Sequence, residues 1–238
     1  MAAARSVRIP TSTPGMLRFF YGPMDCGKST LALQINHNHA RQGRHGLLLT
    51  KLDRAGTARI SSRVGLTANA TEVGADTDLH DVVQAEWRAG RRVDYLICDE
   101  AQFYAPPQIE QAADLADRAG IDVYAFGLAT DFRSELFPGS RRLFELADEL
   151  IRLQVEVLCW CGRPGQQNAR VVDGEVIRTG DQILVADTAS AEDTAARVDV
   201  RYQVLCRRHY RDGDLGPAVP SAGQLALGTP SARNGSAW

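Results

Sequence analysis

The sequence predicts an α/β fold in which helices cover a mostly parallel sheet, followed by a small cysteine-containing module. Apolar runs of strand length alternate with helical patterns from residue 17 to about 152, which is typical of a parallel sheet. A glycine-rich segment joins the first expected strand to the first expected helix. The character of the chain changes near residue 156, where cysteines and a hairpin signal appear.

The individual elements follow from local patterns. We expect strands at 17–21, 46–51, 93–99, 123–127 and 149–155, and helices at 29–42, 78–89, 106–119 and 141–147. The helix at 106 begins with prolines, which a first helical turn tolerates. Asp173-Gly174 lies between β-branched residues and predicts a tight hairpin over 171–177.

Composition excludes several classes of protein. The 238 residues are 44% hydrophobic and 24% charged, and the net charge of −2 gives no overall attraction to nucleic acid or membrane. No apolar run has the length of a membrane span, and residues 1–8 lack the apolar core of a signal peptide. Five cysteines fit reduced thiols or metal ligands better than a disulfide framework, so we expect a cytoplasmic protein.

The strongest motif follows the first expected strand and reads Gly22-Pro23-Met24-Asp25-Cys26-Gly27-Lys28-Ser29-Thr30. It fits the phosphate-binding loop pattern G-x-x-x-x-G-K-[ST] in the strand–loop–helix context that the pattern requires. Backbone N–H groups of such a loop point at an anion, and the helix N-terminus adds its positive dipole end. Lys28 is expected to reach the β- and γ-phosphates of a bound nucleotide, and the Ser29 hydroxyl to bind Mg²⁺. The alternative is a chance glycine-rich turn.

A second motif places two carboxylates, Asp99 and Glu100, directly after an apolar strand. In a phosphate-loop fold this position lies beside the loop at the carboxyl ends of the strands. Asp99 is then placed to hold Mg²⁺, and Glu100 is free to take a proton from a hydroxyl or to orient water. The alternative is a helix cap or a surface pair of acids.

The third group joins Cys159-x-Cys161 to Cys206-x-x-His209. Three thiolates and an imidazole suit tetrahedral Zn²⁺, although the C-x-C pair is tighter than the usual spacing. All four positions are filled by protein, which indicates a structural rather than a catalytic site. The alternative is reduced core cysteines beside a surface histidine.

These motifs divide the chain into four expected parts. Residues 1–15 form a flexible lead, 16–155 a nucleotide-binding α/β domain, 156–211 a zinc-binding domain, and 212–238 a disordered tail poor in residues that can be buried. Residues 188–198 are expected to form a loose loop.

The motifs together resemble the type II, cytosolic-type thymidine kinase family. The resemblance rests on Gly22-Pro-Met-x-x-Gly-Lys-Ser, Asp99-Glu-Ala-Gln-Phe103, the cysteine pair and Leu205-Cys-Arg-Arg-His-Tyr210, and runs from about 17 to 211. It implies a P-loop NTPase-type sheet and a small zinc-ribbon domain with a lasso loop that closes over the base. The implied reaction transfers the γ-phosphate of ATP, bound with Mg²⁺, to the 5′-hydroxyl of thymidine or deoxyuridine. It further implies dTMP as the product of nucleotide salvage, feedback inhibition by dTTP, and a homotetramer.

The resemblance also assigns roles to residues. Glu100 matches the catalytic base, Arg54 the phosphate-side arginine, and Tyr202 the lasso tyrosine. Asn168 stands where many members have threonine. The remaining positions that match the thymidine pocket are Met24, Gln102, Phe103, Leu128, Phe132 and Phe137. On the residues alone, the aromatic side chains Phe103, Tyr104, Phe132 and Phe137 are better explained as core than as rings that stack on a base.

The chain departs from the family pattern at three places. The link Lys51-Leu-Asp-Arg54 is shorter than the usual Lys-Pro-x-Ile-Asp-x-Arg, which leaves the role of Asp53 open. The C-x-C pair replaces C-x-x-C, and the lasso carries an insertion around 189–198.

Three other functions fit parts of the pattern. A kinase of this fold that acts on another nucleoside shares every motif. A nucleic-acid-binding ATPase with a zinc ribbon gains some support from Arg207, Arg208 and Arg211, but none from the near-neutral charge. A regulatory nucleotide-binding protein without phosphoryl transfer would not need the carboxylate pair. We expect neither a nucleic-acid nor a membrane partner.

Overall fold

The main body is a parallel sheet with strand order β5-β2-β6-β7-β1-β8. The structure is a computed structural model that describes residues 13–51, 58–154, 156–180 and 200–217. The strands of this sheet are β1 (Leu17–Tyr21), β2 (Gly46–Thr50), β5 (Thr71–Glu72), β6 (Tyr95–Cys98), β7 (Asp122–Gly127) and β8 (Glu149–Arg152). The parallel sheet predicted from the alternating patterns is therefore confirmed.

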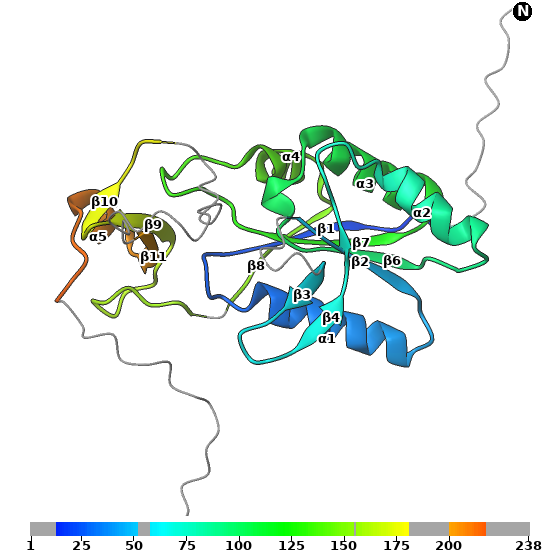
Figure 1. The fold of residues 1–238 in the computed structure, drawn as a ribbon, viewed down its shortest axis with the longest axis horizontal. Coiled ribbons are helices and arrows are strands. Elements are labelled where there is room, and N and C mark those ends of the chain that lie inside the picture. The colour runs from blue at the N-terminus through cyan, green and yellow to red at the C-terminus, as the bar shows by residue number, and fades with distance from the viewer. Residues whose placement is uncertain (1–12, 52–57, 155, 181–199, 218–238) are drawn as a thin grey trace, which may run out of the picture.

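Helices cover both faces of this sheet. Helix α1 (Lys28–Arg41) lies on one face, and α2 (Leu79–Arg88), α3 (Pro106–Ala119) and α4 (Pro138–Leu146) lie on the other (Figure 1). A short 3₁₀ helix, η1 (Ala101–Phe103), follows β6. Within the part of the chain that the structure describes, none of the helices has the length and apolar character needed to cross a bilayer.

Alternate residues of the central strands supply two separate cores. On β7, Val123 and Ala125 pack on the side of α2, α3 and α4, whereas Tyr124 and Phe126 pack with α1. A strand that is buried on both faces needs an apolar side chain at nearly every position. This explains why these strands appear in the sequence as continuous apolar runs.

The helix ends show recognisable stop and start signals. Asp78 caps α2, with its carboxylate accepting hydrogen bonds from the backbone N–H groups of His80 and Asp81. Gly120 ends α3 in the left-handed conformation, with a φ of 67°. Helix α4 begins at Pro138, three residues before the predicted start at 141, because proline fits a first helical turn.

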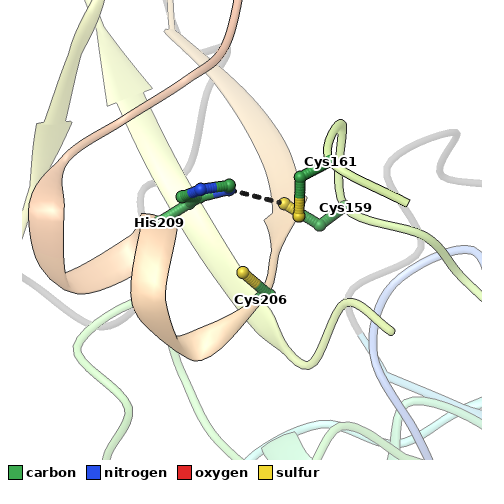
Figure 2. A group of neighbouring side chains, drawn as sticks. All are labelled: Cys159, Cys161, Cys206 and His209. Atoms are coloured by element: carbon green, nitrogen blue, oxygen red, sulfur yellow. Dashed lines mark hydrogen bonds between the residues drawn. The ribbon is translucent and has the colours of Figure 1, made fainter. Parts of the chain in front are cut away.

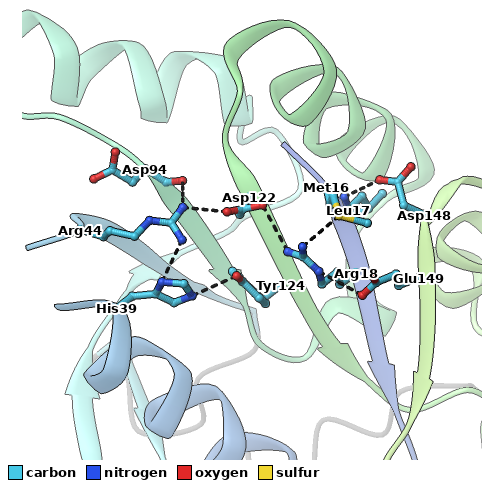
Figure 3. A network of polar contacts seen from close by, with 10 residues as sticks. All are labelled: Met16, Leu17, Arg18, His39, Arg44, Asp94, Asp122, Tyr124, Asp148 and Glu149. Atoms are coloured by element: carbon cyan, nitrogen blue, oxygen red, sulfur yellow. Dashed lines mark hydrogen bonds and ion pairs between the residues drawn. The ribbon is translucent and has the colours of Figure 1, made fainter. Parts of the chain in front are cut away.

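A polar network ties together the amino-terminal ends of several strands (Figure 3). Arg18 of β1 pairs with Asp122 at 3.2 Å and with Glu149 at 3.1 Å. Arg44, which precedes β2, pairs with Asp122 at 2.7 Å and contacts His39 at 2.9 Å. These contacts lie at the amino-terminal ends of the strands, whereas the phosphate loop lies at their carboxyl ends. The network therefore stabilises the fold and is not part of the site.

A second, antiparallel sheet with order β10-β9-β11 lies beyond the carboxyl ends of the main strands (Figure 1). The predicted hairpin is confirmed, since Asp173 and Gly174 both have positive φ values, 49° and 84°, as a tight primed turn requires. Helix α5 and strand β11 were not among the expected elements. The elements of this sheet and its helix are β9 (Gln167–Val172), β10 (Glu175–Ile177), β11 (Val200–Leu205) and α5 (Arg207–Asp212).

A small hairpin also escaped prediction. Strands β3 (Arg59–Ser61) and β4 (Thr67–Asn69) pair with each other near α1 (Figure 1). Each is only three residues long, too short to show a reliable alternation in the sequence.

The chain ends fall largely outside the described residues. Of the expected lead 1–15, only 13–15 are described, and the expected loop 188–198 lies wholly outside. Of the expected tail, residues 212–217 are described, and they pack on the second sheet: Leu215 contacts its core, and Trp160 Nε1 donates to the Asp214 carbonyl oxygen at 3.1 Å.

Candidate active site

The phosphate loop joins β1 to α1 as the sequence predicts. Asp25 and Gly27 have positive φ values of 67° and 80°, and such left-handed turns direct backbone N–H groups to one side. Lys28 is 9% exposed, and its Nζ donates to the Pro23 carbonyl oxygen at 2.8 Å. Cys26 is fully buried beneath the loop. The loop is therefore shaped to accept an anion, with one cation held inside it.

Asp99 meets the loop directly. It follows the last residue of β6, and its Oδ2 accepts a hydrogen bond from the Ser29 hydroxyl at 3.0 Å. Burial, together with the neighbouring charge of Glu100, raises the pKa of Asp99 to about 6. A hydroxyl and a carboxylate oxygen are ligands that Mg²⁺ prefers, so the donor set fits that ion.

Glu100 occupies an unusual backbone position. Its φ of 53° is left-handed, a conformation that costs free energy for a residue other than glycine and is often found at functional sites. Gln102, which is 1% exposed, donates through Nε2 to a carboxylate oxygen of Glu100. Its Oε1 accepts from the Leu128 N–H at 3.0 Å, so Gln102 connects Glu100 to the end of β7. A Cβ at Gly127 would lie 2.7 Å from that oxygen, which explains the glycine there.

The aromatic residues predicted to line the pocket lie in the segments that follow β6 and β7. Phe103 packs edge-to-face on Phe137 with ring centroids 5.3 Å apart. Phe132 and Phe137 are 3% and 4% exposed. Tyr104, also weighed as a site residue, is 1% exposed and belongs to the core of the main sheet.

The second sheet reaches the phosphate loop and this aromatic cluster. Asn168 on β9 accepts a hydrogen bond from the Met24 N–H at 2.8 Å. Tyr202 on β11 lies opposite Arg170 in the strand register, and Arg170 Nε donates to its hydroxyl at 3.2 Å. The guanidinium carbon of Arg170 lies 3.6 Å from the centre of the Phe132 ring.

Sequence reasoning missed Arg170, although a signal was present. Residues two apart on a strand share a face, so a strand through Asn168, as β9 is, puts Arg170 on the same face. The missing information was which side chains from the rest of the chain would meet that face.

The four predicted metal ligands come together. The ligand atoms of Cys159, Cys161, Cys206 and His209 all lie within 4.8 Å of one another (Figure 2). His209 Nδ1 is 3.4 Å from Cys159 Sγ. This cluster of soft sulfur and imidazole ligands fits tetrahedral Zn²⁺.

The surroundings of the cluster favour metal binding. Cys206 stands at the start of α5, where the backbone N–H of His209 lowers the pKa of the Cys206 thiol, while burial raises that of Cys159. Trp160 stacks on the His209 ring at 4.3 Å, and Asp214 lies 4.0 Å from His209 Nε2. His209 thus presents Nδ1 to the cysteines and Nε2 toward Asp214.

The segment around Arg54 and the following hairpin complete the account of the phosphate side. Arg54 and Asp53 lie outside the described residues. Arg63, in the turn between β3 and β4, pairs with Asp25 at 2.6 Å and so brings that hairpin to the phosphate loop. No role was predicted for Arg63 from the sequence.

Comparison with known proteins identifies close relatives. The thymidine kinase family matches residues 15–210. Thymidine kinase of Streptomyces coelicolor is 54% identical over 195 residues, 82% of this chain and 88% of that protein. Thymidine kinase of Cutibacterium acnes is 50% identical over 200 residues, 84% of this chain and 90% of that protein. More distant is the solved genome packaging NTPase B204 of Sulfolobus turreted icosahedral virus 2, 16% identical over 59% of this chain and 75% of that one; its TM-score of 0.39 is too low to support a conclusion.

Proposed function

This chain belongs to the thymidine kinase family, and from that membership we propose a mechanism in which ATP phosphorylates the 5′-hydroxyl of thymidine or deoxyuridine. The main sheet, with the expected boundaries 16–155, binds ATP, and the module 156–211 completes the acceptor site. The observation that carries this assignment is the position of Glu100, which stands next to Asp99 and is linked through Gln102 to the loop that carries Leu128.

Glu100 acts as the general base in this proposal. Its carboxylate takes the proton of the 5′-hydroxyl as that oxygen attacks the γ-phosphorus, and the bond to the β-phosphate oxygen breaks in line. Gln102 orients the carboxylate through the hydrogen bond to its oxygen. The products are dTMP, when thymidine is the acceptor, and ADP.

The phosphate loop and its neighbours stabilise the phosphates. Backbone N–H groups of residues 25–30 surround the β- and γ-phosphates, and Lys28 neutralises charge that develops on the transferred group. Ser29 and Asp99 would hold Mg²⁺, which supplies further neutralisation of the phosphate oxygens. Arg54 is assigned to the phosphates by resemblance alone.

The acceptor pocket is assigned to residues from both parts of the molecule. Asn168 holds the Met24 backbone, and Tyr202 closes the pocket from the second sheet. The main body contributes Met24, Gln102, Phe103, Leu128, Phe132 and Phe137.

Zinc has a structural role in this proposal. Cys159, Cys161, Cys206 and His209 would hold it and thereby join β11 and α5 to the turn at 159–165. The ion supplies folding free energy to a module with little core of its own.

Three further features follow from the family and form part of the proposal. These are inhibition by dTTP bound in the same site, assembly into a homotetramer, and location in the cytoplasm. The last is compatible with five cysteines that form no disulfide.

A nucleoside panel tests the substrate assignment. Purified protein with ATP and Mg²⁺ is incubated with thymidine, deoxyuridine and other nucleosides, and phosphorylated product is measured. We expect thymidine and deoxyuridine to be phosphorylated. Turnover of another nucleoside alone would assign a different kinase, and ATP hydrolysis that requires DNA or RNA would assign the nucleic-acid-dependent ATPase.

Substitution of Glu100 tests the mechanism. Glu100→Gln keeps the shape of the side chain but removes the base, so we expect kcat to fall by about 100-fold to 10,000-fold. The dissociation constant for ATP should stay within about twofold, because the phosphate loop is unchanged. Glu175→Gln, at an exposed hairpin position, is the matched control. Full activity of Glu100→Gln would remove this residue from the mechanism.

A further inference from the structure

Arg170 is a buried cation at the junction of the two parts of the molecule. It lies in the middle of β9 and is 2% exposed, among the largest fully buried side chains in the described structure. Burial of a guanidinium carries a desolvation cost that an apolar side chain at the same place would avoid. A role in packing alone is therefore a poor explanation for an arginine here.

The contacts of Arg170 reach two walls of the proposed acceptor pocket. Its guanidinium carbon lies 3.6 Å from the centre of the Phe132 ring, which belongs to the main body. Its Nε donates to the hydroxyl of Tyr202 at 3.2 Å, on the neighbouring strand of the second sheet. Phe132 is held a second time, because Tyr210 donates from its hydroxyl to the Phe132 carbonyl oxygen at 2.6 Å.

We propose that Arg170 is a positioning residue for the acceptor nucleoside, which sets the Phe132 ring and the Tyr202 hydroxyl in their binding arrangement before the nucleoside arrives. The inference rests on the proposed function and adds a residue to it. Tyr202 is 39% exposed, so without this bond its side chain would retain rotational freedom that nucleoside binding must remove. Arg170 removes that freedom in advance.

The chemistry requires arginine rather than lysine. A planar guanidinium can lie on an aromatic face and donate a hydrogen bond in its own plane at the same time. A lysine ammonium is a compact charge without that plane, so it cannot reproduce both contacts. The groups assigned to the chemical step are held by other contacts: Glu100 by Gln102, and Lys28 by the Pro23 carbonyl. The effect of Arg170 should therefore appear in nucleoside binding rather than in the chemical step.

Steady-state kinetics of Arg170→Lys and Arg170→Met test this inference. We expect the KM for thymidine to rise by about tenfold to 100-fold, the loss expected for a buried cation–π contact and one hydrogen bond. The kcat at saturating thymidine and the KM for ATP should stay within about threefold. A normal thymidine KM in both variants would overturn the inference, and so would a loss confined to kcat.

Arg178→Met is the matched control for a general loosening of the module. Arg178 also stacks on an aromatic ring, that of Tyr210 at 5.2 Å, and donates to the Arg211 carbonyl oxygen at 3.0 Å. Arg178 also donates to the Tyr210 carbonyl oxygen. These contacts touch neither the Phe132 ring nor Tyr202, and they reach Phe132 only indirectly, through the bond from the Tyr210 hydroxyl to the Phe132 carbonyl oxygen. We expect Arg178→Met to lower the melting temperature without the rise in thymidine KM. An equal rise in both arginine variants would overturn the inference.

Tyr202→Phe completes the design. It removes the hydroxyl that Arg170 contacts, so its effect on the thymidine KM should be smaller in the Arg170→Lys background than in the wild type. Fully additive effects would contradict positioning through Tyr202. This variant and Arg170→Lys decide the question if Arg170→Met does not fold.

A wild-type protein that phosphorylates no nucleoside would contradict the proposed function. An active wild-type protein whose variants keep a normal thymidine KM would contradict only the role of Arg170.

Discussion

Asp122 connects neighbouring strands of the main sheet at the end away from the candidate active site. It begins β7, and its side chain is 22% exposed between Arg18 of β1 and Arg44 before β2 (Figure 3). Burial alone would raise the pKa of Asp122, but the hydrogen bonds from Arg44 and Arg18 outweigh it and lower that pKa. The ionised carboxylate is therefore favoured in the folded protein.

This linkage predicts the effect of Asp122→Asn. A carboxylate whose pKa is lower in the folded than in the unfolded chain stabilises the fold above the unfolded value, about 3.9, and loses that contribution as the pH falls through the folded value. We expect the substitution to lower the free energy of unfolding by about 1–2 kcal/mol near pH 7. The difference should narrow as the pH falls below about 4. Urea unfolding at several pH values measures it.

The control is Asp117→Asn, which removes an exposed carboxylate from α3. It should leave the unfolding free energy within about 0.5 kcal/mol at every pH. A difference between wild type and Asp122→Asn that does not depend on pH would contradict the role of the charge.

Single residues were predictable from the sequence where their role depends on local spacing. The loop pattern placed Lys28 and Ser29 at the start of a helix, and the apolar run placed Glu100 just after a strand. The structure has these positions, and the roles of the three residues stay predictions. The bond from Met24 to Asn168 joins residues 144 positions apart, and no local pattern contains it. The resemblance placed Asn168 near the substrate, but its contact required the fold.

At the scale of elements, the start of α2 gives a clear case of a local signal with a tertiary role. The Asp78 carboxylate accepts from the His80 N–H at 2.7 Å and also from Gln111 Nε2 of α3 at 3.0 Å. Gln111 Oε1 in turn accepts from the Leu79 N–H at 3.0 Å. One side chain therefore caps α2 and ties it to α3.

Removal of this cap should destabilise the whole main body. We expect Asp78→Ala to lower the free energy of unfolding by about 1–2 kcal/mol, because helical N–H groups and Gln111 lose their acceptor. Chemical denaturation measures the change. Asp76→Ala, at an exposed position just before the helix, should change it by less than about 0.5 kcal/mol. Equal effects of the two substitutions would show that the cap contributes nothing specific.

Elements differ in how well the sequence predicts them. The central strands are buried, nearly continuous apolar runs, and α3 is a long amphipathic helix; their expected ranges match the structure closely. Strands β3 and β4 have three residues each and helix α5 has six. Such short segments show neither the two-residue period of a strand nor the 3.6-residue period of a helix in the sequence. The β3–β4 hairpin is placed by tertiary contacts, namely the burial of Ile60 in the core beside α1 and the pairing of Arg63 with Asp25.

At the scale of the whole molecule, the second sheet and the main body meet at the proposed acceptor pocket. Asn168 binds the Met24 backbone, and Tyr210 binds the Phe132 backbone. Within the described residues the core of the module is small, and its buried members are Cys159, Ala169, Leu205, Cys206 and Tyr210. Two of these are proposed metal ligands, so we expect the fold of the module, and with it the acceptor pocket, to depend on the metal cluster.

Loss of zinc should therefore impair thymidine binding at the acceptor pocket and leave ATP binding at the phosphate loop unchanged. Cys161→Ser changes the one exposed ligand of the cluster and so disturbs packing least. We expect this variant to contain no zinc, to unfold in two steps as the module melts first, and to lose thymidine turnover by about 100-fold or more, because two pocket walls lose their anchors. The dissociation constant for ATP should stay within about threefold, since the phosphate loop belongs to the main sheet.

Metal analysis, thermal unfolding and nucleotide titration measure these effects. The control is Arg163→Ser, at an exposed neighbouring position, which should retain zinc. Metal-free protein with normal thymidine turnover would show that the cysteine cluster does not support the pocket.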